Sequence, residues 1–341
     1  MKLKSREFLD TRTNSVHAAS IEFWKGEPVF AWFGGSREGA ADVSLFIDKL
    51  NCNSCLTLGN MDTMPRWNPI LFAHDGKLWL FEKAGQFCDR WQTFIHDIGS
   101  CKPGEPIKSA QVLPAGLNGP VKTRPVVVGG EIVCGSAVET FHDWTSYMEN
   151  YTIDSSSEWV LSSRSNPISV KEKKSHADFR GNAKQTLGII QPAIWEDRNG
   201  LHSFFRSSSG LGRIYYSRRI NDSWSDDSCW TDPVATNLLN PNSGVDVVCV
   251  NEKIYLVSNQ SETLRNPISI REIKKNSPED WETVDELIIR ESINEEDKRS
   301  SGGACLSEEL SYPYMIEHEG ELHLVYTYGR KYIEYCVVNL D

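Results

Sequence analysis

The feature that most constrains this chain is a hairpin pattern that recurs six times along it. Each copy consists of two β-rich runs separated by a short turn, and most turns carry Asp-Gly, Gly-Gly, Asn-Gly or Glu-Gly signals. The six copies begin at His17, Asn68, Arg124, Gln191, Asp246 and Tyr312. Their spacing of roughly 50 to 70 residues fits one four-stranded sheet per repeat. The sequence therefore predicts an all-β protein, a six-bladed β-propeller of four-stranded antiparallel blades.

The outer strands of the repeats support the same interpretation. A third strand candidate follows every hairpin, and a fourth follows the first five. The sixth repeat has no fourth candidate before Asp341, and the segment from Glu7 to Thr11 can supply it. Such a pairing would close the ring and remove the exposed sheet edges. We therefore expect residues 1–341 to form a single propeller domain whose ring is closed by an N-terminal strand.

The charge of the chain limits its partners. The formal net charge is -11, whereas nucleic acids and acidic membrane surfaces are bound by basic surfaces. The segment from Met1 to Ser15 lacks an apolar signal core, and no stretch approaches the ~18 apolar residues of a membrane span. We therefore expect a cytoplasmic protein without nucleic-acid or membrane partners, and the oligomeric state stays open.

The cysteines and histidines do not form a recognisable metal motif. Several of the nine cysteines lie in apolar strand-like runs, which is typical of buried free thiols. The pair Cys52 and Cys55 has no second pair at zinc-site spacing, and the eight histidines are dispersed. No glycine-rich phosphate loop opens a helix after a strand. The sequence predicts neither a metal site nor a cofactor.

Polar side chains gather where the propeller should have a mouth. The first strand of each blade begins beside the central channel, so the six first residues named above should meet there, and all of them are polar. Loops between second and third strands open on the same face and carry Arg37, Asp42, Lys83, Glu139, Arg206, Asn259, Tyr328 and Arg330. Arg66, Trp67 and Asn242 flank the first residues in PRWNP and NPNSG. Channel mouths of propellers are also wet, so polarity alone does not require a function.

The type of polar residue favours an anionic ligand. Several arginines facing one concave mouth would repel one another unless they are paired or occupied by an anion. Their guanidinium groups suit a carboxylate, which they can bind bidentately. A small carboxylated oligosaccharide would satisfy them, and Trp67 offers an aromatic face for a sugar ring.

Five stretches of the chain resemble the sialidase superfamily, in particular its branch of predicted neuraminidases with BNR-like repeats. They are HAASIEFWKGEPVFAWFGGSREG, PRWNPILF, GIIQPAIW, NPNSGVDVV and SYPYMIEHEGELHLVYTYGR. The resemblance implies a six-bladed propeller with an arginine triad for the substrate carboxylate, a tyrosine nucleophile assisted by a glutamate, and an aspartate as acid/base. It implies Asp42 as the acid/base, Tyr312 as the nucleophile, and Arg206 with Arg330 or Arg124 as triad members.

The mouth positions and the resemblance together give the candidate site residues, and the resemblance implies the activity. His17, Asp42, Gln191 and Tyr312 are the catalytic candidates. The substrate-binding candidates are Arg37, Arg66, Trp67, Asn68, Arg124, Arg206, Asn242, Asp246, Tyr328 and Arg330. The expected activity is exo-acting cleavage of a terminal linkage at a carboxylated sugar.

Two positions depart from the sialidase pattern and open other possibilities. His17 stands where sialidases have a triad arginine, and Gln191 stands where they have the glutamate that activates the tyrosine. The degenerate aspartate boxes, such as SRRINDSWSDDSCW, depart as well. Ulvan and rhamnosyl-glucuronate lyase propellers, which this chain also resembles, cleave beside a uronate with histidine and tyrosine. In that chemistry His17 would be the base and Tyr312 the acid. A glycan-binding propeller without activity is the third possibility.

Overall fold

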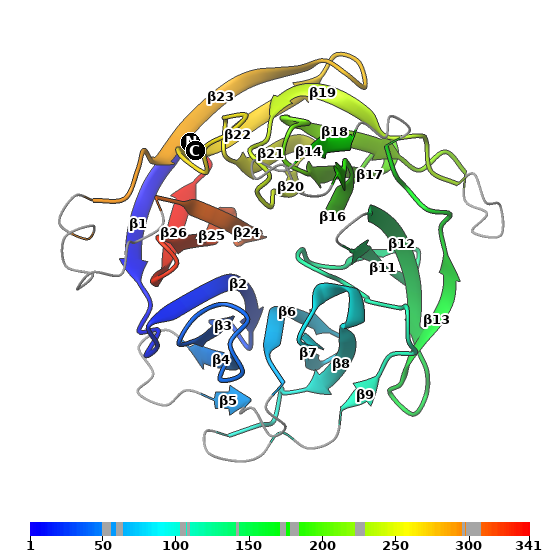
Figure 1. The fold of residues 1–341 in the computed structure, drawn as a ribbon, viewed down its shortest axis with the longest axis vertical. Helices are drawn as coiled ribbons and strands as arrows, with labels where there is room; N and C mark the ends of the chain where they lie inside the picture. The colour runs from blue at the N-terminus through cyan, green and yellow to red at the C-terminus, as the bar shows by residue number, and fades with distance from the viewer. Residues whose placement is uncertain are drawn as a thin grey trace.

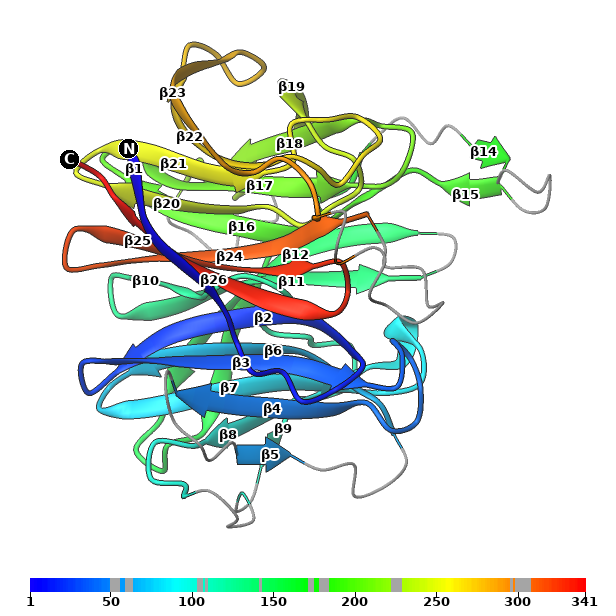
Figure 2. The same cartoon turned by 90° about the vertical axis from the view of Figure 1, so that its left-hand side faces the viewer.

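The computed structural model describes residues 1–49, 56–58, 64–102, 107, 110–140, 143–170, 175–177, 184–221, 229–294, 297 and 308–341. Six four-stranded antiparallel sheets stand in a ring around a central axis, as Figure 1 shows along that axis and Figure 2 from the side. The predicted six-bladed propeller is confirmed. Cys52 and Cys55 lie outside the described residues.

Each of the first three blades runs outward from the channel in chain order. Blade 1 consists of β2 (Ser15–Trp24), β3 (Glu27–Gly35), β4 (Ser44–Lys49) and β5 (Leu56–Leu58). Blade 2 consists of β6 (Arg66–His74), β7 (Lys77–Ala84), β8 (Gln92–Asp97) and β9 (Gln111–Val112), with the 3-10 turn η1 (Cys88–Arg90) after β7. Blade 3 consists of β10 (Val126–Val128), β11 (Glu131–Glu139), β12 (Trp144–Ile153) and β13 (Trp159–Arg164).

The remaining blades follow the same plan, and the last one borrows a strand. Blade 4 consists of β16 (Ile189–Asp197), β17 (Gly200–Ser207), β18 (Arg213–Arg218) and β19 (Val234–Leu239). Blade 5 consists of β20 (Asp246–Val250), β21 (Lys253–Ser258), β22 (Ile268–Lys275) and β23 (Trp281–Arg290). Blade 6 consists of β24 (Leu310–His318), β25 (Glu321–Tyr328), β26 (Tyr332–Asn339) and the N-terminal β1 (Lys2–Phe8).

The N-terminal strand closes the ring, as the sequence predicted. β1 pairs antiparallel with β26, from Lys2 opposite Asn339 to Phe8 opposite Glu334. The predicted segment, Glu7 to Thr11, overlaps this strand only at Glu7 and Phe8, so its bounds were wrong. The segment Lys2–Phe8 has four charged residues and no apolar alternation. It becomes a strand because the edge of β26 offers backbone partners.

A short hairpin projects from the ring between blades 3 and 4. Its strands, β14 (Ser175–Ala177) and β15 (Lys184–Thr186), pair with each other and with no other described strand. The hairpin lies in a polar, charged segment of the chain between Asn166 and Thr186.

Four of the innermost strands contain a β-bulge at the same level. The pairing with the second strand shifts between His17 and Ser20, Trp67 and Ile70, Ile190 and Ala193, and Ser311 and Tyr314. One residue in each bulge has a positive φ, namely Ala18 (51°), Asn68 (41°), Gln191 (57°) and Tyr312 (54°). The equivalent of Tyr312 in blade 1 is therefore Ala18, and His17 precedes it by one residue. A one-residue offset turns a side chain to the other face of a sheet.

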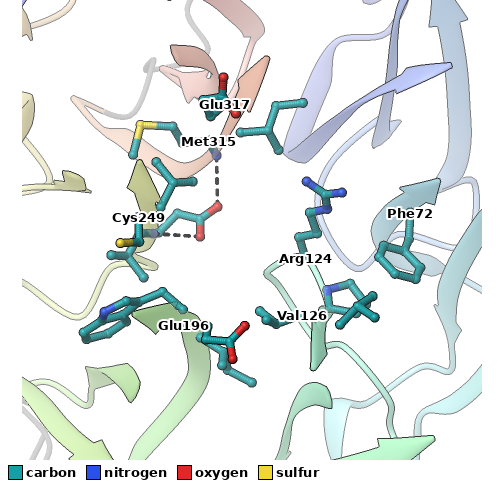
Figure 3. A pocket seen from close by; sticks show the side chains of 15 residues that line it. Phe72, Arg124, Val126, Glu196, Cys249, Met315 and Glu317 are labelled. Carbon is teal, nitrogen blue, oxygen red and sulfur yellow. Dashed lines mark hydrogen bonds between the residues drawn. The ribbon is translucent and has the colours of Figure 1, made fainter. Parts of the chain in front are cut away.

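Blades 3 and 5 bring different residues to this level than the sequence predicted. Lys122 and Gly244 lie as many residues before the hairpin turns of blades 3 and 5 as the four bulge residues lie before theirs. They therefore stand at the same level of the channel. Arg124 and Asp246 lie two residues further along the channel wall. They line a cavity of about 350 Å³ at the other end of the channel, together with Glu196 and Glu317 (Figure 3). Their predicted place in the mouth with Tyr312 was therefore wrong.

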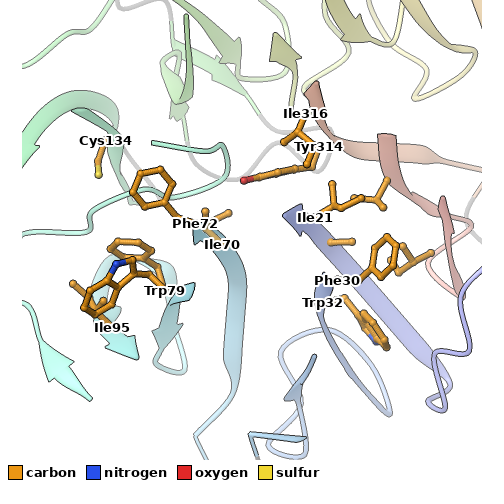
Figure 4. Packing of buried hydrophobic residues seen from close by; sticks show 14 of the residues in the cluster. Ile21, Phe30, Trp32, Ile70, Phe72, Trp79, Ile95, Cys134, Tyr314 and Ile316 are labelled. Atoms are coloured by element: carbon orange, nitrogen blue, oxygen red, sulfur yellow. The ribbon is translucent and has the colours of Figure 1, made fainter. Parts of the chain in front are cut away.

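The core consists of apolar side chains packed between neighbouring blades. Alternate residues of the inner strands, such as Phe30 and Trp32 of β3 and Phe72 of β6, are almost fully buried (Figure 4). Trp159 of blade 3 packs edge-on against Trp79 of blade 2, with ring centroids 5.6 Å apart. Each such side chain stabilises the fold by about 1.5–3 kcal/mol through burial. The packing fixes the blades around the channel and so positions the site.

Candidate functional site

Tyr312 stands at the centre of a polar cluster at the mouth of the channel. Its hydroxyl accepts a hydrogen bond from Arg206 Nη1 at 2.6 Å and another from Gln191 Nε2 at 3.1 Å. The His17 ring lies against the Tyr312 ring, with centroids 4.1 Å apart. The structure therefore brings three of the four predicted catalytic residues together, with Gln191 at the phenol oxygen and His17 against the phenol ring. Two donors at that oxygen suit an oxygen that carries negative charge during a reaction.

Arg206 is buried, and its contacts are with neutral groups. It comes from β17 and is 5 % exposed. Its Nε donates to Asn242 Oδ1 at 2.9 Å and its Nη1 donates to Gln191 Oε1 at 3.1 Å. Among the described residues, no carboxylate lies within ion-pair distance of this guanidinium, and Nη2 has no hydrogen-bond partner. The charge and the free donors are available to an anion in the mouth.

Two further arginines face the same place and share a carboxylate. Arg265, in the loop between β21 and β22, donates to Asn242 O at 2.7 Å and to Glu309 Oε2 at 3.3 Å. Arg330, after β25, donates to Glu309 and to Glu38. Burial would raise the pKa of Glu309, but Arg330 and Arg265 hold it below its ordinary range. Burial and the neighbouring Arg206 lower the pKa of Arg265.

His17 is buried and electrostatically disfavoured as a cation. Its Nδ1 is 2.9 Å from Thr327 Oγ1, and its Nε2 is buried and has no hydrogen-bond partner among the described residues. Burial lowers its pKa well below the ordinary value, and the positive charges of Arg330 and other cations add to this effect. The imidazole is therefore neutral at neutral pH and has one unengaged nitrogen.

Asp42 and Arg37 lie in an exposed loop beside the mouth. The loop joins β3 to β4, and its Glu38 pairs with Arg330. Asp42 accepts hydrogen bonds from the Ser36 amide and hydroxyl, both at 2.9 Å, and the hydroxyl bond is the main cause of its lowered pKa. Both Asp42 and Arg37 are exposed, and no side-chain hydrogen bond joins either of them to Tyr312.

Trp67 and Asn68 line the wall that blade 2 presents to the mouth. Trp67 is half-buried beneath Gly39 of the β3–β4 loop, and its indole N–H donates to Gly85 O at 2.8 Å. Asn68 is buried and donates to Val121 O at 3.0 Å. The described contacts of Asn68 are thus with the protein backbone.

Two predicted substrate-binding residues are engaged elsewhere in the blades. Arg66 pairs with Glu82 at 2.8 Å within blade 2. Tyr328 is fully buried and packs against Phe8 of the closing strand, and its hydroxyl donates to Asp297 at 2.6 Å. Side chains alternate between the two faces of a strand. The residues next to Arg66 and Tyr328 therefore point to the opposite face of the sheet.

Lys122 lies directly beneath the cluster and crosses the channel. Its ammonium donates to Val245 O at 3.0 Å and to Pro313 O, the carbonyl that follows Tyr312. A Cβ on Gly244 would lie 2.8 Å from Lys122 Cε, so a larger residue at this position would require the lysine side chain to shift. Burial lowers the pKa of Lys122 to about 8.

Sequence reasoning did not include Arg265, Glu309 or Lys122 in the site. Arg265 and Glu309 stand in polar loops without a strand pattern, and only the tertiary structure brings these loops together. Lys122 could have been found from the spacing between the hairpin turn of blade 3 and its first strand.

Comparison with known proteins identifies the family. The model of the BNR repeat-like domain matches residues 26–324, which is most of the chain. The chain belongs to the BNR repeat-like domain family. A search of curated protein sequences found no match to this BNR repeat-like propeller.

Solved structures show the same fold at low sequence identity. Trypanosoma rangeli sialidase is 10% identical with a TM-score of 0.58, and the match covers 100% of this chain and 58% of that one. The BNR repeat-like propeller thus spans little more than half of the sialidase. The polysaccharide lyase Uly1 is also 10% identical, with a TM-score of 0.51 and 100% of both chains covered. A neuraminidase-like protein of A/little yellow-shouldered bat/Guatemala is 9% identical, with a TM-score of 0.53 and 99% of both chains covered.

The described part of the BNR repeat-like propeller offers no obvious metal site. In the described ranges, no three His, Cys, Asp or Glu side chains are grouped so as to hold a metal ion. The same residues include no helix that is long and apolar enough to cross a membrane.

Proposed function

We propose that this propeller is an exo-acting, sialidase-like glycosidase that cleaves a terminal linkage at a carboxylated sugar. One observation carries the proposal: buried Arg206, which has no carboxylate partner among the described residues, points at the Tyr312 oxygen together with Gln191. A buried guanidinium without a countercharge is costly, so the arrangement favours a ligand that supplies the negative charge.

The substrate carboxylate would bind at Arg206 and Arg265. Asn242 holds both, because its side-chain oxygen accepts from Arg206 and its backbone oxygen accepts from Arg265. Arg330 adds positive charge from blade 6, although Glu309 and Glu38 already neutralise part of it. Structures of the similar Trypanosoma rangeli sialidase contain sialic acid and a covalent intermediate, which supports an anionic sugar as ligand.

Tyr312 would attack the ring carbon as a phenolate. Arg206 and Gln191 then donate hydrogen bonds to its anionic oxygen. Where sialidases have a glutamate that acts as a base, Gln191 thus acts as a hydrogen-bond donor. The new bond forms between that oxygen and the sugar carbon, and water later releases the sugar. When water bonds to the sugar carbon, the electron pair of the bond between that carbon and Tyr312 returns to the tyrosine oxygen.

Elimination at a uronate is the second candidate, and His17 favours it. A neutral imidazole against the Tyr312 ring provides a base next to an acid, as β-elimination requires. The polysaccharide lyase Uly1 has the same fold over its whole length. The His17 nitrogen that would act as base is buried, however, so substrate could reach it only if the site opens.

The deciding experiment compares products. The protein is incubated separately with sialosides and with uronate-containing oligosaccharides. Released sialic acid or another intact acidic sugar supports the glycosidase, and the ultraviolet absorbance of an unsaturated uronate supports the lyase. Binding without any product over a broad panel would leave a glycan-binding propeller and contradict both activities.

A substitution then tests Tyr312 directly. For the glycosidase, Tyr312→Phe should lower kcat on the order of 10³-fold while circular dichroism and melting temperature stay close to wild type. Tyr147→Phe is the matched control, because Tyr147 is a half-exposed tyrosine of blade 3 away from the cluster. Full activity of Tyr312→Phe would remove the tyrosine from either mechanism.

A further inference from the structure

Glu139 is a carboxylic acid in the mouth, and the proposed function gives it no role. It is the last residue of β11 and pairs with Trp144 in the sheet of blade 3. Together with Asn68 and Gln191 it lines a small cavity between blades 2, 3 and 4. Its carboxylate is half-buried, and it has no hydrogen-bond partner among the described residues. A carboxyl group in that situation is not used to hold the fold together.

The charges around Glu139 belong to the same cluster as Tyr312. Arg206, which donates to the Tyr312 hydroxyl, is near enough to stabilise the Glu139 carboxylate, and Glu38 is near enough to destabilise it. The negative charge of Glu139 also contributes, after burial, to the raised pKa of Cys88 in blade 2. Glu139 therefore lies in blade 3 within electrostatic reach of Arg206, and it lines the same cavity as Gln191, which donates to the Tyr312 hydroxyl.

The environment of Glu139 suits an acid better than that of Asp42. Burial raises the pKa of Glu139, while Arg206 opposes this effect and Glu38 adds to it. Asp42 is fully exposed, and the two hydrogen bonds from Ser36 lower its pKa. A group that must donate a proton near neutral pH needs a raised pKa.

We propose that Glu139 is the acid/base residue of this site, donating a proton to the bridging oxygen of the substrate and later taking one from water. The inference rests on the proposed glycosidase activity. It assigns to blade 3 the role that the family resemblance gives to Asp42 of blade 1.

The proton transfers balance over one turnover. In the first half, the O–H bond of Glu139 breaks as its proton binds the bridging oxygen. That oxygen takes the electron pair of the breaking carbon–oxygen bond, and the Tyr312 phenolate supplies the pair for the new bond to carbon. In the second half, water oxygen bonds to the carbon and its proton returns to Glu139. The electron pair of the bond between carbon and Tyr312 returns to the phenolate, so one water is consumed.

The test varies the leaving group. An alkyl alcohol needs a proton in order to leave, whereas a nitrophenolate leaves without one. Glu139→Gln should lower kcat/KM about 10²- to 10⁴-fold on an alkyl-linked acidic glycoside and less than about 10-fold on the nitrophenyl glycoside. With the alkyl substrate, the wild-type rate should fall as the pH rises through the raised pKa of Glu139. The Glu139→Gln variant, measured with the nitrophenyl substrate that it still cleaves, should not show this fall in rate.

Two variants complete the experiment. Glu158→Gln removes the same charge from an exposed turn of the same blade and should change neither substrate's rate. Asp42→Asn tests the competing assignment of Asp42 as the acid, and any loss of kcat/KM in this variant should not depend on the leaving group. If Asp42→Asn shows the leaving-group dependence and Glu139→Gln does not, Glu139 is not the acid. Equal losses of Glu139→Gln on both substrates would assign it a merely electrostatic or structural role. If wild type cleaves neither substrate, the glycosidase proposal fails together with this one.

Discussion

At the residue scale, the site is built from side chains on unusual backbone. Tyr312, Gln191, Asn242 and Arg330 all have positive φ, at 54°, 57°, 60° and 62°. For residues other than glycine this conformation costs of order 1–3 kcal/mol each, and it persists only where the surroundings enforce it. Here it turns four polar groups toward one mouth. The concentration of such residues at one place is typical of a functional site.

The first prediction concerns the orientation of the arginines. Asn242→Ala removes the oxygen that accepts from Arg206 Nε and leaves the backbone bond to Arg265 in place. A charge-assisted hydrogen bond contributes about 1.5–3 kcal/mol, so KM for an anionic glycoside should rise about 10- to 100-fold, with a smaller change in kcat.

The matched control for this prediction is Asn199→Ala, in the exposed turn between β16 and β17. It should have wild-type kinetics. An unchanged KM in Asn242→Ala would show that Asn242 does not position the arginines.

At the element scale, the bulges in the inner strands decide which side chains reach the mouth. In blades 2, 4 and 6 the bulge contains Asn68-Pro69, Gln191-Pro192 and Tyr312-Pro313. Proline has no backbone N–H, so the paired strand loses a hydrogen bond there and the extra residue is accommodated. The bulge turns the residue before the proline into the channel. The dipeptide of a polar residue and proline is thus the local sequence feature that accompanies these three bulges.

The closing strand carries the second prediction. β1 pairs along β26, its Phe8 packs on Tyr328, and Met1 and Lys4 form ion pairs with Asp285 and Glu321. Removing residues 1–12 should lower the melting temperature by about 10 °C or more and promote association, because the edge of β26 becomes exposed.

Differential scanning fluorimetry and light scattering would measure these two effects. Removal of exposed Asp341 alone serves as the control and should leave both unchanged. Wild-type stability of the shortened protein would contradict closure of the ring by this strand.

At the scale of the whole molecule, the ring is tied across its channel as well as around its rim. Lys122 of blade 3 bonds to backbone oxygens between blades 4 and 5 and at the start of blade 6. Two residues further along the channel wall, Asp246 accepts a hydrogen bond from Met315 N at 2.9 Å and connects blades 5 and 6. One of these polar contacts fixes the backbone of Pro313, the residue that directly follows Tyr312. They therefore help to position Tyr312 from beneath the site.

The third prediction is the pH dependence that Lys122 adds to stability. Its pKa is about 8 in the folded protein, whereas an unfolded lysine titrates near 10.4. Between these values the unfolded state binds more protons, so the contribution of Lys122 to the free energy of unfolding rises with pH. The wild type should gain about 2.5 kcal/mol over Lys122→Met between pH 7 and pH 10.

Urea unfolding of both proteins at several pH values would measure this difference, and the comparison cancels the titration of other groups. A difference that stays constant with pH would show that Lys122 keeps its proton in the folded state.

The sequence alone determined the architecture and a large part of the site. Six hairpins at a regular spacing allow few other folds, because four-stranded sheets must cover their apolar faces against one another. The positions of Tyr312, Gln191, Arg206 and Asn242 followed from the repeats and from the family resemblance, and the structure brings all four together.

Only the tertiary structure decided the remaining members. The direction of a strand side chain depends on register, and the bulge in β2 offsets His17 from Tyr312 by one residue. Arg66 and Tyr328 are engaged in other contacts within their blades. Arg265 and Glu309 come from loops whose contacts depend on how blades 5 and 6 pack. Period and composition describe a chain locally, whereas these contacts join residues that are distant in sequence.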